Sequence, residues 1–270
     1  MLIRNSASAI MHATLEFFRQ WKALVITLAI YALLLIAIYA FITTREATSA
    51  QVVLTVALTI ATPLLFFTLQ TATTNYATTW SGRKFIMTSL LNSWKLFVVS
   101  LPVIILTTLF VYLLNKIQAR YLAGAVSTAV DPYIMAGSGK VSRPIHWGAV
   151  TITSLRYLLL GVLAPLSLIH LWLGTSRDGL ISSFRGFLTH LTRAFTARSV
   201  LIYITGFLIF AVVPYFLLFK TTATTRAWLE IGLFAARLIA IFCLTLFGWV
   251  ITVRAQSLAK ESASMAAKVA

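Results

Sequence analysis

The sequence predicts an all-α polytopic integral membrane protein with six transmembrane helices. Of its 270 residues, 60% are apolar and 10% are charged, whereas an ordinary soluble domain has about 25% charged residues. A soluble fold of this composition would have too few polar side chains to cover its surface. In lipid, every backbone amide must be satisfied within the protein, so only helices and closed barrels span a membrane. The apolar runs are too long for barrel strands and lack a period of two, so they indicate helices.

Six apolar segments are long enough to cross a bilayer. Each holds roughly 18 to 25 residues, and a rise of about 1.5 Å per residue carries this length across a hydrocarbon core of about 30 Å. We predict one membrane domain over residues 1–270, with an outer loop at about 115–154 and a cytoplasmic tail at 254–270. The predicted spans are Ala23–Thr43, Gln51–Gln70, Leu96–Leu114, Leu155–Trp172, Val200–Phe219 and Trp228–Val253.

The basic residues predict the orientation of the chain. The formal net charge is +16, and the Lys and Arg residues lie mainly between the spans. This placement is typical of loops at an anionic membrane surface, so we expect lipid rather than nucleic acid as the partner. With a cytoplasmic N-terminus, the inner segments hold 13 basic residues and the outer segments hold 8, and Arg237 lies inside a span. The excess predicts that both termini are cytoplasmic.

Three of the spans are preceded by an amphipathic stretch. These stretches lie at about 10–21, 85–94 and 181–195, and each carries apolar residues at helical spacing opposite polar ones. Such helices lie in the membrane interface with Trp and basic residues at headgroup level. The predicted interfacial anchors are Trp21 with Lys22 and Trp94 with Lys95.

The same positions align as a threefold repeat. The residues around Trp21–Lys22 correspond to those around Trp94–Lys95, and Pro63–Leu69 resembles Pro165–Leu171. Each unit has the order interfacial helix, span, outer loop and span. The predicted units are about 8–70, 84–174 and 181–253.

This layout and the two Trp-Lys pairs resemble a broad group of bacterial six-span membrane proteins of unknown function. That group is similar to the membrane domain attached to some glycerophosphodiester phosphodiesterases. The resemblance covers most of the chain and implies a bacterial cytoplasmic membrane protein. It implies no hydrolase activity, because the 270 residues contain no such catalytic domain.

Glu230 and Arg237 form the sharpest polar feature inside a span. Seven residues make nearly two helical turns, which places both side chains on one face about 10.5 Å apart along the axis. One interpretation is an interfacial pair in which Arg237 extends toward the headgroups. The other is a polar cavity, substrate path or partner contact. The same helix carries a stripe of small residues that favours close helix packing, namely Gly232, Ala236 and Ala240.

No catalytic, cofactor or metal site is predicted. The six carboxylates are scattered over different segments, and the four histidines lack the spacing of paired metal ligands. The loop Gly137–Ser142 fails the phosphate-loop pattern, because Val141 stands where Ser or Thr is required.

The leading functional expectation is a non-catalytic scaffold or accessory subunit that acts through lipid or protein contacts. Its expected partners are membrane lipids and either a membrane protein or a second copy of the chain. The alternative is a transporter or permease for a small or amphipathic solute. Four prolines inside spans favour kinks, which occur in transporters and in passive bundles alike: Pro63, Pro102, Pro165 and Pro214.

Overall fold

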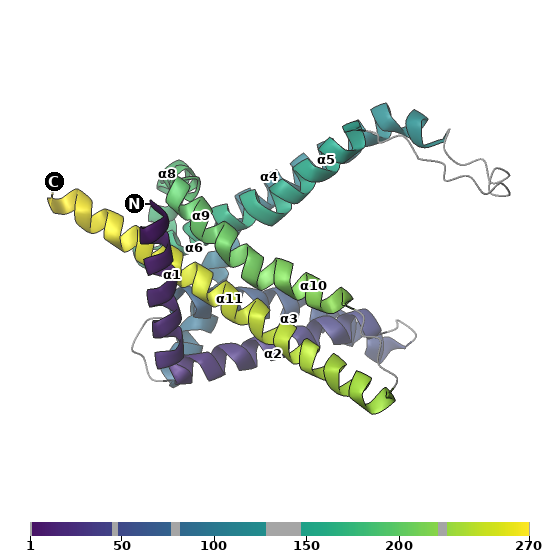
Figure 1. Cartoon of the computed structure of the whole chain (residues 1–270), viewed down its shortest axis with the longest axis horizontal. Coiled ribbons are helices and arrows are strands. Elements are labelled where there is room, and N and C mark those ends of the chain that lie inside the picture. Colours follow the sequence, from purple (N-terminus) through teal and green to yellow (C-terminus); the bar gives the residue numbers. More distant parts are fainter. Residues whose placement is uncertain (1, 45–47, 77–81, 128–146, 221–225, 270) are drawn as a thin grey trace. The chain divides into compact units, whose positions relative to one another are not determined.

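The protein is all-helical over the residues that its computed structural model describes, which are 2–44, 48–76, 82–127, 147–220 and 226–269 (Figure 1). Six helical segments are long and apolar enough to cross a membrane, and each contains one predicted span, which confirms the six predicted apolar helices. The segments are Trp21–Thr43, Ser49–Thr74, Gly82–Arg120, Trp147–Asp178, Ala197–Phe219 and Trp228–Glu261.

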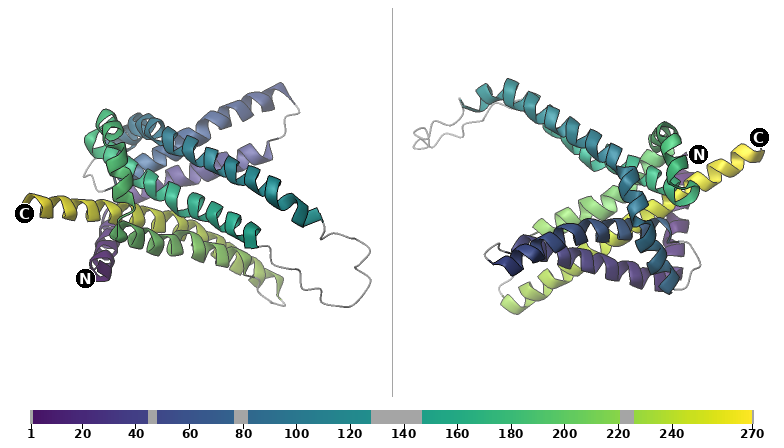
Figure 2. Two further views of the ribbon diagram at one scale, coloured as in Figure 1. Left: turned by 90° about the horizontal axis from the view of Figure 1, so that it is seen from above. Right: turned by 180° about the vertical axis from the view of Figure 1, so that it is seen from behind.

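The chain divides into two compact units, residues 1–99 with 169–270, and residues 100–168. In the first unit, α2 lies beside α3, and α11 lies beside α9 and α10 (Figure 2). In the second unit, Arg156 of α5 donates a hydrogen bond to the Gln118 side chain of α4. The helices up to the π-helical turn η2 are α1 (Leu2–Arg19), α2 (Trp21–Thr43), α3 (Ser49–Thr74), α4 (Gly82–Ser127), α5 (Trp147–Leu158) and η2 (Leu159–Leu163). Those that follow are α6 (Ala164–Asp178), α7 (Leu180–Arg185), α8 (Phe187–Ala194), α9 (Ala197–Phe207), the π-helical turn η3 (Leu208–Val212), α10 (Val213–Phe219) and α11 (Ala227–Val269).

Local signals explain several helix boundaries. α3 begins with a capping box, in which the Thr48 hydroxyl accepts a hydrogen bond from the Gln51 amide while the Gln51 side chain accepts one from the Thr48 amide. α6 ends at Asp178, and the next residue, Gly179, has a φ of 84°, in the left-handed region that glycine adopts without strain. The chain therefore turns sharply from α6 into α7.

A proline follows each of the two π-helical turns, whereas Pro63 and Pro102 lie inside regular α-helices. η2 ends two residues before Pro165, and η3 ends two residues before Pro214. A proline ring collides with the carbonyl four residues earlier, which here belongs to Gly161 or Phe210, the middle residue of each π turn. Widening the helix at that point relieves the collision.

The amphipathic stretches differ in how they join their spans. α1 is separate from α2, and α7 and α8 are separate from α9. The second stretch is instead the start of α4, which continues into the third span. No Gly or Pro stands between Gly82 and Pro102 to interrupt the helix.

Helices also extend into two segments predicted as connections. α4 continues to Ser127 and α5 begins at Trp147, so the predicted outer loop is partly helical, and its residues 128–146 lie outside the described part of the chain. The predicted tail continues α11 to Val269. The first residues of this tail pack against α1 through buried alanines of both helices, Ala255 and Ala259 with Ala9 and Ala13.

The core of the first unit joins α1 to the ends of the spans. Phe17 of α1 stacks on Tyr76 with ring centroids 5.3 Å apart and contacts Phe247 of α11 at 5.0 Å. Leu69 and Val250 complete the centre of this cluster. These contacts hold α1 against the C-terminal part of α11, so the first and last helices of the chain meet (Figure 1).

Candidate functional site

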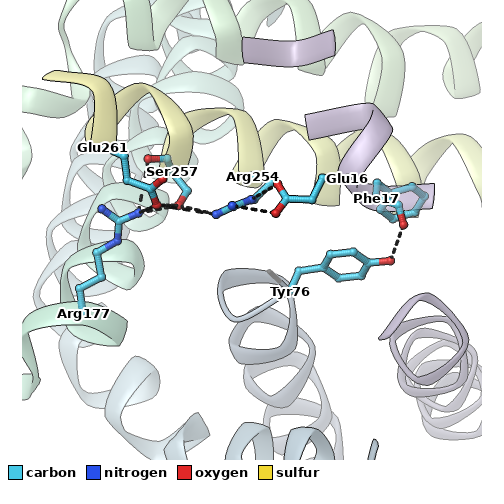
Figure 3. Close-up of polar contacts among 7 residues, drawn as sticks. All are labelled: Glu16, Phe17, Tyr76, Arg177, Arg254, Ser257 and Glu261. Atoms are coloured by element: carbon cyan, nitrogen blue, oxygen red, sulfur yellow. Dashed lines mark hydrogen bonds and ion pairs between the residues drawn. The ribbon is translucent and has the colours of Figure 1, made fainter. Parts of the chain in front are cut away.

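Charged side chains from α1, α6 and α11 meet in an interhelical ion network formed by Glu16, Arg177, Arg254, Ser257 and Glu261 (Figure 3). Arg254 donates two hydrogen bonds to the Glu16 carboxylate, Nε to Oε2 at 2.8 Å and Nη2 to Oε1 at 3.0 Å. Arg254 also lies 3.8 Å from Glu261, which accepts a hydrogen bond from Arg177. The Ser257 hydroxyl accepts from Arg254 at 3.2 Å and from Arg177 at 2.7 Å.

The spacing of residues on α11 creates this network. Arg254, Ser257 and Glu261 stand three and four residues apart, so they share one helix face. The Arg254 side chain is only 14% exposed, and low exposure to water strengthens its interaction with the carboxylates. The network therefore fastens both α1 and α6 to α11.

Tyr76 makes a second polar link from the end of α3 to α1. Its hydroxyl donates a 3.0 Å hydrogen bond to the backbone carbonyl of Phe17 (Figure 3). That carbonyl lies in the last turn of α1, where carbonyls lack intrahelical partners. Burial raises the pKa of the Tyr76 phenol, so the hydroxyl stays protonated and remains a donor.

A further group of titratable side chains involves α6, α8 and α11, and we call it the basic cluster: His170, His190, Arg193 and Lys260. Their charges lie close enough to interact with one another. The His190 ring packs directly on α6, since a Cβ at Gly174 would lie 2.7 Å from its Cε1. Burial lowers the pKa of His190, and nearby Lys260 lowers it further, against the opposing effect of Asp178. His190 is therefore neutral near pH 7.

Glu230 and Arg237 lie in the N-terminal half of α11. Glu230 is exposed, and it takes part in none of the ion pairs found among the described residues, which join Arg177 and Arg254 to Glu16 and Glu261. The Arg237 guanidinium donates a hydrogen bond to the backbone carbonyl of Lys220, just after α10. A role for either side chain in solute or partner contact stays a prediction.

The small-residue stripe of α11 lies apart from the close helix contacts within the first unit. A Cβ added at Gly232 would meet no atom within 4 Å. The close contacts occur further toward the C-terminus of α11, where Gly248 lies against Phe210 of η3 and Thr252 lies against Gly206 of α9. Packing of Gly232, Ala236 and Ala240 against another helix stays a prediction.

The four predicted interfacial anchors lie at the surface of the first unit. Trp21 is 63% exposed, with the Lys22 ammonium 5.8 Å from its ring centroid. Trp94 is also exposed and lines an apolar groove with residues of α3, while Lys95 beside it is partly buried. Exposed Trp and Lys side chains of this kind fit a headgroup environment.

The sequence alone does not reveal the ion network or the basic cluster. Glu16 and Glu261 lie at opposite ends of the chain, among carboxylates that are scattered over different segments. The only local signal was the polar spacing of Arg254, Ser257 and Glu261 within the predicted tail. Within the described ranges, no three His, Cys, Asp or Glu side chains gather closely enough to hold a metal ion.

No protein-family model, curated protein or solved structure matches this chain. What the protein does must therefore be inferred from its own geometry.

Proposed function

We propose that this chain is a non-catalytic component of a membrane assembly, a scaffold or accessory subunit that acts through contacts with lipids and with a membrane protein or a second copy. The observation that carries this proposal is the exposed apolar surface at the start of α11, on the sides that α10 does not cover. Large apolar side chains on several sides of this segment are exposed, including Trp228, Ile231, Phe234 and Ile239.

The glycines of α9 and α11 support this interpretation. A Cβ at Gly206 would lie 1.9 Å from the Thr252 hydroxyl, and one at Gly248 would lie 2.9 Å from the Phe210 side chain. Glycine thus permits the close approach of α11 to α9 and η3. At about 100° per residue, Gly232 points roughly 160° away from Gly248. α11 therefore carries a second small-residue face on a different side, suited to a further helix.

Topology and location follow as parts of the same proposal. We place both termini in the cytoplasm of a bacterial cell, because the basic residues are more numerous on that side. The threefold repeat is supported by α1 and by α7 with α8, which each precede a span as separate interfacial helices. The resemblance to bacterial six-span membrane proteins fits this arrangement.

The second candidate is a transporter or permease for a small or amphipathic solute. The observation in its favour is the pair of π-helical turns within two spans, since such turns are frequent at functional sites. Each turn is followed by Pro165 or Pro214, whose ring favours a local widening of the helix, so this observation carries less weight than the exposed apolar surface of α11.

Cross-linking in native membranes followed by purification tests the proposal. Gly232→Leu fills the small-residue face, whereas the control Leu238→Phe alters a position about 120° away on the same helix. We expect wild type and Leu238→Phe to retain a reproducible cross-linked partner or second copy, and Gly232→Leu to lose it.

Two results would contradict the proposal. One is that cross-links from this face of α11 reach only residues 100–168 of the same chain. The other is saturable solute flux through the purified protein in liposomes, which would establish the transporter.

A further inference from the structure

Lys260 is the most unusual member of the basic cluster. Its Nζ is buried and has no hydrogen-bond partner among the described residues. An ammonium carries three donors, and a buried charge without a partner is strongly unfavourable. Among the described residues, the charges that interact with Lys260 are those of His170, Arg177, His190 and Arg193, and the acid that opposes them is Asp178.

The charges around Lys260 do not balance. The positive charge of Arg177 is compensated by Glu261, with which it forms an ion pair. Within the part of the chain that the structure describes, Arg193 and Lys260 remain and Asp178 offsets one of them, while neutral His190 adds no charge. One positive charge is left over, which matches the single negative charge of a phosphodiester.

The cluster also has hydrogen-bond donors beyond Lys260. The imidazoles of His170 and His190 are 5% and 6% exposed, and Arg193 lies at the surface. The Gln256 amide beside them is fixed by a 2.7 Å hydrogen bond to the Ser199 carbonyl. Nε2 of His170 and Oε1 of Gln256 are both buried without a hydrogen-bond partner among the described residues. A phosphate oxygen accepts several hydrogen bonds and binds such donors strongly when they are charged.

The neighbouring helices place the cluster at the depth of lipid phosphates. α7 and α8 expose apolar side chains, with Ile181 and Leu188 each 72% exposed and Phe184 also exposed. An amphipathic segment of this kind lies in the interface, with its apolar side in the acyl region. Basic pockets between helices at this level bind anionic headgroups.

From this geometry we propose that the basic cluster is a binding site for a phosphate group at the membrane interface, supplied by an anionic phospholipid headgroup or by free phosphate. Lys260 supplies the buried charge, and Arg193 supplies the charge at the surface. This site is independent of the proposed scaffold role, because it requires no protein partner.

Thermal unfolding of the purified full chain in neutral detergent tests the site. Three additives are compared: dihexanoyl phosphatidylglycerol, dihexanoylglycerol with the same acyl chains but no phosphate, and inorganic phosphate. At about 100 times its Kd, a bound ligand is expected to raise the Tm by about 5 °C. We expect phosphatidylglycerol to produce this shift and dihexanoylglycerol, which lacks the phosphate, to produce little. An equal response to inorganic phosphate means that the phosphate group alone is sufficient, and no response to it identifies the lipid as the source.

Lys260→Met and Arg193→Gln test the two charges, and Arg185→Gln on exposed α7 is the matched control. We expect at least tenfold weaker phosphatidylglycerol binding in the first two variants and wild-type binding in the control. Lys260→Met removes a buried charge while keeping the side-chain length, so without lipid its Tm should equal or exceed that of wild type. If Lys260→Met does not fold, the phosphatidylglycerol binding of Arg193→Gln alone tests the proposal. Equal Tm shifts with the two lipids, no shift with any additive, or an unchanged phosphatidylglycerol shift in the variants would overturn the proposal.

Discussion

The ion pair between Glu16 and Arg254 allows the sharpest test of how α1 is held against α11. The perturbation is a double-mutant cycle with Glu16→Gln, Arg254→Gln and the double variant. Glutamine keeps a similar shape but removes the charge, so the cycle isolates the coupling between the two side chains.

The structure sets the expected size of the coupling. Two hydrogen bonds of 2.8 Å and 3.0 Å join the side chains, and hydrogen bonds to charged groups contribute about 1.5–3 kcal/mol each. The side chains are 14% and 30% exposed, so the pair lies between an exposed pair, worth about 0.2–1 kcal/mol, and a buried pair, whose disruption costs about 3–5 kcal/mol. We expect a coupling of about 1.5 kcal/mol. Arg254→Gln should cost more than Glu16→Gln, because Arg254 also contacts Ser257 and Glu261.

The assay is unfolding in mixed micelles with increasing sodium dodecyl sulfate, which gives the free energy of unfolding of each variant. Glu230→Gln on the exposed part of α11 serves as the control and should change that free energy by less than about 0.5 kcal/mol. A coupling below about 0.3 kcal/mol would refute the reasoning, since the two side chains would then contribute independently.

Three further predictions concern stability. Gly206→Ala should reduce the free energy of unfolding by about 2 kcal/mol, because its Cβ would lie 1.9 Å from the Thr252 hydroxyl. Gly232→Ala is the control and should not destabilise the protein, because the space around Gly232 is open. An equal loss of unfolding free energy in the two variants would contradict the described packing. Tyr76→Phe should cost about 1–2 kcal/mol in the same assay, because the buried Phe17 carbonyl loses its donor, and a neutral effect would mean that this bond is not needed. The pKa of His190 lies below its ordinary value of 6.5 in the folded chain, so the unfolded chain binds more protons and the Tm should fall as pH drops below about 6.5. His190→Asn should flatten this dependence, whereas His12→Asn, at an exposed position of α1, should not. Both variants leave intact the groups that face His190, namely His170, Asp178, Arg193 and Lys260. The same pH profile in wild type and both variants would refute the assignment.

The spans were predictable because lipid imposes a simple requirement on long segments. A helix such as Trp21–Thr43 must be apolar over its whole length, and this is visible in the local sequence. The unbroken α4 was not predicted, although the absence of Gly and Pro between Gly82 and Pro102 agrees with it. Amphipathic periodicity shows which face of a helix is apolar and does not show where an interfacial helix ends and a span begins.

The polar contacts were not predictable because they depend on pairings between distant segments. Glu230 and Arg237 are easy to identify, because they are charged residues inside an apolar run. Arg254 and Glu261 follow the apolar run, so hydropathy places them in the predicted tail. The structure instead joins that tail to Glu16 of α1 and Arg177 of α6. No pattern in a single sequence relates these residues, since the packing of α1 on α11 brings them together.

The central claim is that six helices cross a membrane and that α1 and the C-terminal part of α11 meet on one side of it. Labelling of single cysteines with a membrane-impermeant maleimide, in a Cys243→Ser background, tests this claim directly. We predict that Ser8→Cys and Ser182→Cys react only from the cytoplasmic side, whereas Thr44→Cys and Lys220→Cys react only from the opposite side. Labelling of Ser8→Cys and Thr44→Cys from the same side would contradict it, because α2 could not then span the membrane.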